Sequence, residues 1–158
     1  MAEDLEKQIR DYLEAHNIAT LAVSEGNTPG AHTVYYVSQG LRLYFESNPY
    51  SDKIRILKSN PRVSLTVDED YRDWRAIKGI QLFGRAKLVE ARKAPELEQE
   101  FHRKFPHLND IGGIPENHVF VEITPEKIYF LDFTKELGHK SAFIPGNLGQ
   151  SFLSKVNW

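Results

Sequence analysis

Hydrophobic side chains recur at helical spacing near the N-terminus and then alternate with polar ones along most of the chain. Leu5, Ile9, Tyr12 and Leu13 share one helical face, which predicts a helix over about residues 3–16. Alternation and short apolar runs between turn residues predict seven strands. They span residues 18–23, 31–38, 41–47, 62–67, 79–90, 118–124 and 127–133, with shorter helices over 51–58 and 94–105.

Turn residues separate these elements. Gln39-Gly40 links two strands as a hairpin, and Asn60-Pro61 ends a helix, because a residue before proline avoids helical angles. Gly84, in the middle of the longest strand, predicts a bend or bulge. Thr124-Pro125-Glu126 is a turn signal that separates the last two predicted strands. No pattern predicts an element within residues 134–158.

This order of elements predicts a mainly β protein, an antiparallel β-barrel of six or more strands with flanking helices. No repeat or linker interrupts the pattern, so a single domain over residues 1–158 is expected. Its parts are an N-terminal helix (about 3–16), the barrel (about 18–133) and a C-terminal tail (134–158).

Composition narrows the function. The 158 residues carry a net charge of −2, so neither a nucleic-acid nor a membrane surface is expected. The absence of cysteine excludes disulfides, thiolate zinc sites and cysteine nucleophiles. No apolar run approaches the roughly 20 residues that span a bilayer, and the start of the chain is not a signal sequence. A cytoplasmic location is therefore expected.

The titratable residues form no recognisable catalytic motif. The six histidines include no His-Glu-x-x-His pair, so no metal site is predicted. The carboxylates of residues 68–73 are interpreted as a solvated loop rather than as a catalytic acid pair. A triad of serine, histidine and aspartate stays open, although no G-x-S-x-G sequence occurs.

One loop combines groups that bind anions. Ser47, Asn48 and Ser51 precede the helix over residues 51–58, and Lys53 lies in its first turn. Hydroxyls, free backbone N–H groups and a cation at a helix N-terminus are typical of a phosphate site. The alternative is an ordinary helix cap with a solvated lysine.

Aromatic residues give two further candidates. In the strand around His32, alternation places His32, Val34 and Tyr36 on one face and Thr33 and Tyr35 on the other. Such a strand can offer backbone groups to a flat ring, or it can be an ordinary aromatic-rich strand. Tyr71 and Trp74 lie in a polar loop, where Trp74 is a core plug, a dimer contact or a lid over a ligand.

Taken together, these segments resemble the FMN-binding split β-barrels related to pyridoxamine 5′-phosphate oxidase, over about residues 18–143. The resemblance rests on His32-Thr33-Val34-Tyr35, on the strand leading to Ser47-Asn48, and on Lys53 seven residues before Asn60. It also rests on the sequences NPRVSL (60–65) and GIQLFGRA (79–86). The sequences around Tyr71 and Phe101 resemble an uncharacterised branch rather than the oxidase itself.

The resemblance implies a homodimer with two FMN molecules at the subunit interface. It implies that His32, Thr33, Val34 and Tyr35 run past the isoalloxazine ring, mainly through backbone. It implies that Ser47, Asn48 and Lys53 hold the phosphate, and that Gly79 and Gln81 lie near the flavin edge. Tyr71, Trp74 and His139 are the candidates for the substrate side.

Three positions depart from the vitamin B6 oxidases. Asp52 stands where an arginine precedes the phosphate-binding lysine, and Arg55 is the residue that would compensate. Val37 replaces a basic residue for the substrate phosphate, and Leu137-Gly138-His139 retains only the histidine of an Arg-x-His pair. A phosphate without cationic partners is strongly penalised, so oxidation of B6 phosphates is not expected.

The leading hypothesis is an FMN-dependent oxidoreductase that transfers hydride or electrons to or from an unidentified small molecule. The alternative is a protein that binds flavin or haem without turnover. A barrel that has lost its cofactor site is the third interpretation.

Overall fold

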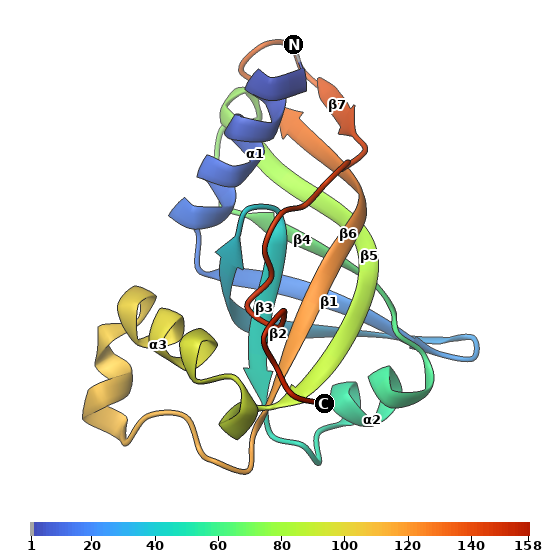
Figure 1. Ribbon diagram of the computed structural model, residues 1–158. Helices are drawn as coiled ribbons and strands as arrows, with labels where there is room; N and C mark the ends of the chain where they lie inside the picture. The colour runs from blue at the N-terminus through green and yellow to red at the C-terminus, as the bar shows by residue number, and fades with distance from the viewer. Residues whose placement is uncertain (1) are drawn as a thin grey trace.

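The computed structural model describes residues 2–158 (Figure 1). Six strands form the barrel, and all their pairings are antiparallel. The strand order is β3-β2-β1-β4-β5-β6, and a further pairing of β3 with β6 closes the barrel. The barrel strands are β1 (Ile18–Glu25), β2 (Thr28–Gln39), β3 (Arg42–Ser47), β4 (Arg62–Asp68), β5 (Lys78–Glu90) and β6 (Val119–Asp132). The predicted mainly β fold with an antiparallel barrel is confirmed.

Helices flank the barrel as expected. The helices are α1 (Ala2–Ala15), α2 (Asp52–Ser59) and α3 (Pro95–Lys104), with 3₁₀ turns η1 (Trp74–Ala76), η2 (Ala91–Lys93) and η3 (Pro106–Ile111). Asn60 is the C-cap of α2, as the following proline predicts. Within the described residues, no helix has the length and apolar character needed to cross a membrane.

Two apolar cores hold these elements. The first fills the barrel, where α1 contributes Ile9 and Leu13 and α2 contributes Ile54 and Leu57. The second lies outside the barrel, where Leu97 and Phe101 of α3 join Tyr44, Phe120 and Leu153. The second core fixes α3 against the outer side of β3 and β6.

The expected turn at Thr124-Pro125-Glu126 is wrong, because β6 is one continuous strand through these residues. Phe83 pairs with Lys127 whereas Gly84 pairs with Pro125, which leaves Glu126 as the extra residue of a bulge. A Cβ on Gly84 would lie 2.3 Å from the Thr124 carbonyl oxygen, so only glycine allows this approach. The bulge predicted at Gly84 is therefore present, with its extra residue on β6.

The C-terminal tail is more ordered than predicted. Strand β7 (Lys140–Phe143) pairs with β6 outside the closed barrel. The chain then returns along the barrel (Figure 1), where the Arg42 guanidinium donates to the carbonyl of Gln150 at 3.0 Å. At the end of the chain, the Lys87 ammonium lies 4.1 Å from the centre of the Trp158 ring. Trp158 therefore packs on this chain's own barrel.

Candidate cofactor site

The loop between β3 and α2 brings its predicted hydroxyls together. The Ser47 hydroxyl is buried and lies 3.0 Å from that of Ser51. The Asn48 side chain accepts a hydrogen bond from the Tyr50 backbone N–H at 2.8 Å, which fixes the turn before the helix. Ser51 is the N-cap of α2 but makes no side-chain cap hydrogen bond. The first-turn N–H groups of α2 therefore have no side-chain acceptor at Ser51 and face the open end of the helix.

The cations of α2 differ in their partners. Arg55 forms ion pairs with Glu25 and, at 3.8 Å, with Asp52. Lys53 is half-buried and takes part in no ion pair among the described residues. Arg55 is thus already engaged by two carboxylates, and Lys53 is the cation of the first turn that can serve an anion.

Strand β2 leaves one backbone edge without a strand partner. Its residues 28–35 pair with β1, but β2 pairs with β3 only from Tyr36 to Gln39. The Tyr36 N–H donates to the Asn17 carbonyl at 3.1 Å, toward the β1 side. Alternate residues of an antiparallel strand direct N–H and C=O to opposite edges, so Thr33 and Tyr35 direct theirs away from β1. Within the described chain, no strand completes that edge of β2 before Tyr36.

The side chains of β2 alternate as predicted. Val34 and Tyr36 are buried in the barrel, whereas Thr33 is exposed and Tyr35 is 59% exposed. The strand opens away from β3 at the level of Glu46 and Ser47, just before the loop that contains Asn48. The free edge of β2 and the loop before α2 therefore border one split in the barrel wall.

Within one chain, Gly79 and Gln81 lie away from this split. Cross-strand pairing places Thr33, Thr20, Thr66 and Gln81 in one row across β2, β1, β4 and β5. Three strand spacings separate Thr33 from Gln81, about 14 Å along the sheet. The nine predicted cofactor residues thus form two groups, with seven at the split and two on the outer face of β5.

The predicted substrate-side residues lie near the second group. Tyr71 and Trp74 are in the loop that leads into β5, and His139 follows β6. A hydrogen bond from the Phe133 N–H to the Ile77 carbonyl, at 2.9 Å, joins the two loops. Trp74 is 74% exposed, so it is not a core plug.

The row also contains a residue that the sequence interpretation missed. Tyr129 pairs with Gln81 across β5 and β6, between Lys127 and Lys140. A hydrogen bond with the Lys127 ammonium, and to a smaller extent the charge of Lys140, hold the pKa of the Tyr129 hydroxyl below its usual value. Strand alternation places Tyr129 outward, but only the register of β5 and β6 places it beside Gln81.

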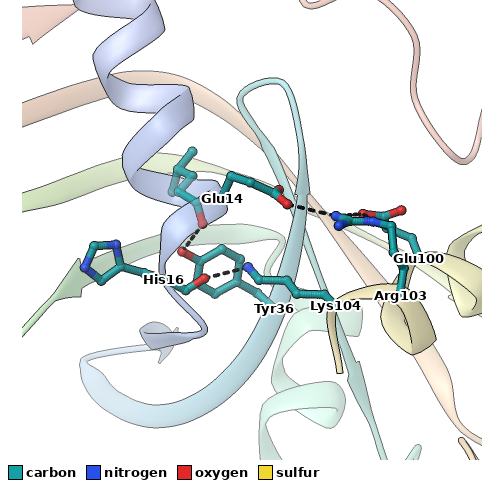
Figure 2. A network of polar contacts seen from close by, with 7 residues as sticks. Glu14, His16, Tyr36, Glu100, Arg103 and Lys104 are labelled. Atoms are coloured by element: carbon teal, nitrogen blue, oxygen red, sulfur yellow. Dashed lines mark hydrogen bonds and ion pairs between the residues drawn. The ribbon is translucent and has the colours of Figure 1, made fainter. Parts of the chain in front are cut away.

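A polar network anchors β2 to α1 and α3 (Figure 2). The Tyr36 hydroxyl donates to the Leu13 carbonyl at 2.7 Å, and the Lys104 ammonium lies 4.3 Å from the Tyr36 ring centre. Lys104 also donates to the His16 carbonyl at 2.5 Å, at the end of α1. Burial lowers the pKa of Lys104 to about 8.

The neighbouring Arg103 reinforces the same junction. Its guanidinium pairs with Glu14 of α1 at 2.8 Å and with Glu100 of its own helix, as Figure 2 shows. Together, Lys104 and Arg103 join α3 to the end of α1 next to Tyr36. These contacts anchor β2 at Tyr36, whereas the backbone edge at Thr33 and Tyr35 stays open.

This barrel is that of a known family. The family model described as pyridoxamine 5′-phosphate oxidase matches residues 5–132, so the chain belongs to that family. This chain is 24% identical over 105 residues to the UPF0306 protein PM1958 of Pasteurella multocida, and the alignment covers 65% of this chain and 70% of that protein.

Solved structures share the fold. A Listeria innocua protein assigned as a pyridoxamine 5′-phosphate oxidase is 25% identical, with a TM-score of 0.67 over 81% of this chain and 98% of that one. A FAD-binding protein of Mesorhizobium loti is 28% identical, with a TM-score of 0.62 over 79% and 89%. A haem-binding protein of Mycobacterium smegmatis, 16% identical, reaches a TM-score of 0.70 over 86% and 57%, which shows the shared fold alone.

Proposed function

We propose that this protein binds FMN as a homodimer and acts as a flavin-dependent oxidoreductase on a small molecule. The observation that carries the proposal is the split, where β2 leaves β3 just before the loop that leads into the uncapped N-terminus of α2. Bound FMN would supply the hydride or electron transfer. The membership of the pyridoxamine 5′-phosphate oxidase family and the likeness to a FAD-binding protein support a flavin.

The residues at the split fit the two ends of FMN. Ser47, Asn48, Lys53 and the first-turn N–H groups of α2 would hold the phosphate, because hydroxyls, N–H groups and an ammonium match its oxygens. Backbone N–H and C=O groups of Thr33 and Tyr35 would pair with the polar edge of the ring. His32 and Val34 complete the segment of β2 that positions these groups.

A homodimer would unite the two groups of residues. Gln81 and Gly79 lie too far from the split to contact the same ring, and Phe83 beside them is 47% exposed. Tyr35, at 59%, and Ile18, at 44%, are also exposed on the outer face of the barrel. An apolar outer face of this kind favours a second copy, which would place Gln81 of the partner subunit at the flavin edge.

The chain's own residues argue against a B6 phosphate as the substrate. Val37, at the position where a basic residue was expected, is fully buried in the core under α3. Asp52 lies at the start of α2 and pairs with Arg55. In the loop after β6, Leu137 stands two residues before His139, where the Arg-x-His pair would have an arginine.

Two measurements test this function in order. Titration of the purified protein with FMN, followed by flavin fluorescence, is expected to saturate at one FMN per chain. Reduction of the complex by NADH or NADPH, followed by absorption, then separates an enzyme from a protein that only binds flavin. A protein that binds haem but not FMN would overturn the proposal, and a bound flavin that no donor reduces would overturn its enzymatic part.

A further inference from the structure

A cavity of about 220 Å³ lies beside the open edge of β2. Tyr35 of β2 and Glu46 of β3 form one side of it, and α3 with η3 forms the other. It therefore adjoins the point where β2 and β3 separate. The lining includes Tyr35, Glu46, Phe101, Phe105, Leu108 and Ile111.

The walls of this cavity are mainly aromatic. The Phe105 ring lies edge-on to Tyr35, with 5.9 Å between the ring centres. Phe101 stacks beside Phe105 at 6.3 Å, with an angle of 28° between the ring planes. Flat apolar rings pack well in such surroundings, because edge-on and stacked contacts add to the burial of apolar area.

The charged groups that line the cavity determine which substituents a bound flat ring can carry. Glu46 is the cavity's one carboxylate, and no lysine or arginine is among the described residues that line it. The lining also includes His107, an exposed residue whose ring lies edge-on to Phe105 at 6.2 Å. His118 contacts the Glu46 Oε2 atom at 2.5 Å, which orients the carboxylate while Oε1 has no hydrogen bond within the described chain. A ligand with a hydrogen-bond donor would find an acceptor here, whereas a phosphate or carboxylate would be repelled.

We propose that this cavity is the substrate pocket and takes a small flat ring that carries a hydrogen-bond donor for Glu46, neutral or cationic, and no anionic group. The assignment rests on the proposed flavin site, because Tyr35 belongs both to the cavity and to the open edge of β2. It moves the substrate side from Tyr71, Trp74 and His139 to the junction of β2, β3 and α3.

The test uses three probes that share an indole ring: tryptamine, tryptophol and indole-3-acetate. Binding to the FMN-loaded protein is measured by saturation-transfer NMR and calorimetry. Tryptamine and tryptophol are expected to bind roughly tenfold or more tightly than indole-3-acetate. Glu46→Gln should bring tryptamine down to the affinity of tryptophol, while the control Glu126→Gln, an exposed acid paired with Arg85, should leave the order unchanged.

Two substitutions test the location. Leu108→Trp fills the cavity and Ile111→Trp, at an exposed rim position, narrows its mouth; both should weaken all three probes while the circular dichroism stays native. Unchanged binding in both folded variants, or equal affinity of the three probes in the unmodified protein, would overturn the pocket.

The flavin spectrum distinguishes this inference from the proposed function. Tryptamine is expected to shift the absorption of bound FMN, because the cavity adjoins Tyr35. Binding without a spectral shift would overturn the role as substrate pocket although FMN binds. Probe binding by a protein that takes up no FMN would overturn the proposed function and leave only the pocket.

Discussion

Thr33 and Gln81 lie in one row across the outer face of the barrel, yet three strand spacings keep them about 14 Å apart. Thr33 borders the split in the barrel wall, and Gln81 lies on a surface that exposes Phe83. If both residues serve one flavin, they belong to different subunits.

Subunit mixing tests that arrangement. Lys53→Ala and Gln81→Ala remove one residue from each half of the proposed site. In a mixed dimer one site carries both substitutions and the other carries neither, so about a quarter of the sites in an equal mixture should recover FMN affinity. Fluorescence titration before and after mixing measures this fraction. A site built from one chain would recover no affinity on mixing.

Placing a charge on the exposed face of β5 should dissociate the dimer. Phe83→Asp is expected to yield a folded monomer that binds FMN at least tenfold more weakly, because a carboxylate in an apolar interface is desolvated without a partner. Ile144→Asp, at a residue that is also exposed and apolar but lies in the C-terminal segment, is the control. Sedimentation velocity measures the mass, and a dimeric Phe83→Asp would contradict this interface.

Gly84→Ala is expected to lower the free energy of unfolding by about 3 kcal/mol, because its methyl group would overlap the Thr124 carbonyl. Gly146→Ala, where nothing lies within 4 Å of the added carbon, should change stability little. Urea denaturation measures both. A Gly84→Ala protein of unchanged stability would mean that the bulge at Glu126 can move aside.

Lys104 makes stability depend on pH in a defined direction. Its pKa is about 8 in the folded chain, below its ordinary value of 10.5. Between these values the unfolded chain binds more protons, so the unfolding free energy contributed by Lys104 rises with pH. Urea denaturation from pH 7.5 to 9.5 should show this rise. Lys104→Met should remove it, whereas Lys58→Met, exposed on α2, should retain it.

Local sequence predicted the elements whose determinants are local. The alternation around Val34 and the proline after Asn60 depend on neighbouring residues, and both features are present. The turn predicted at Pro125 is wrong because proline is also tolerated in a β-bulge. That bulge depends on Gly84, which belongs to another strand. A contact between distant residues cannot be recognised from either segment alone.

The same limit applies to the candidate site. Ser47, Asn48 and Lys53 are close in sequence, so their grouping at one helix N-terminus was predictable. The open edge at Thr33 and Tyr35 depends on where β2 leaves β3, which is a property of the closed barrel. The cavity beside Tyr35 depends on the packing of α3, which no motif indicates.

The dissociation constant of FMN for Lys53→Ala, compared with that for Lys58→Ala, tests the proposed cofactor site most directly. Both lysines belong to α2, but only Lys53 lies in the first turn beside Ser51. Loss of one charge-assisted phosphate contact should cost roughly 1.5–3 kcal/mol, a factor of about 10 to 150 in affinity. Lys58→Ala should bind FMN like the unmodified protein, and equal dissociation constants for the two variants would contradict the phosphate site at α2.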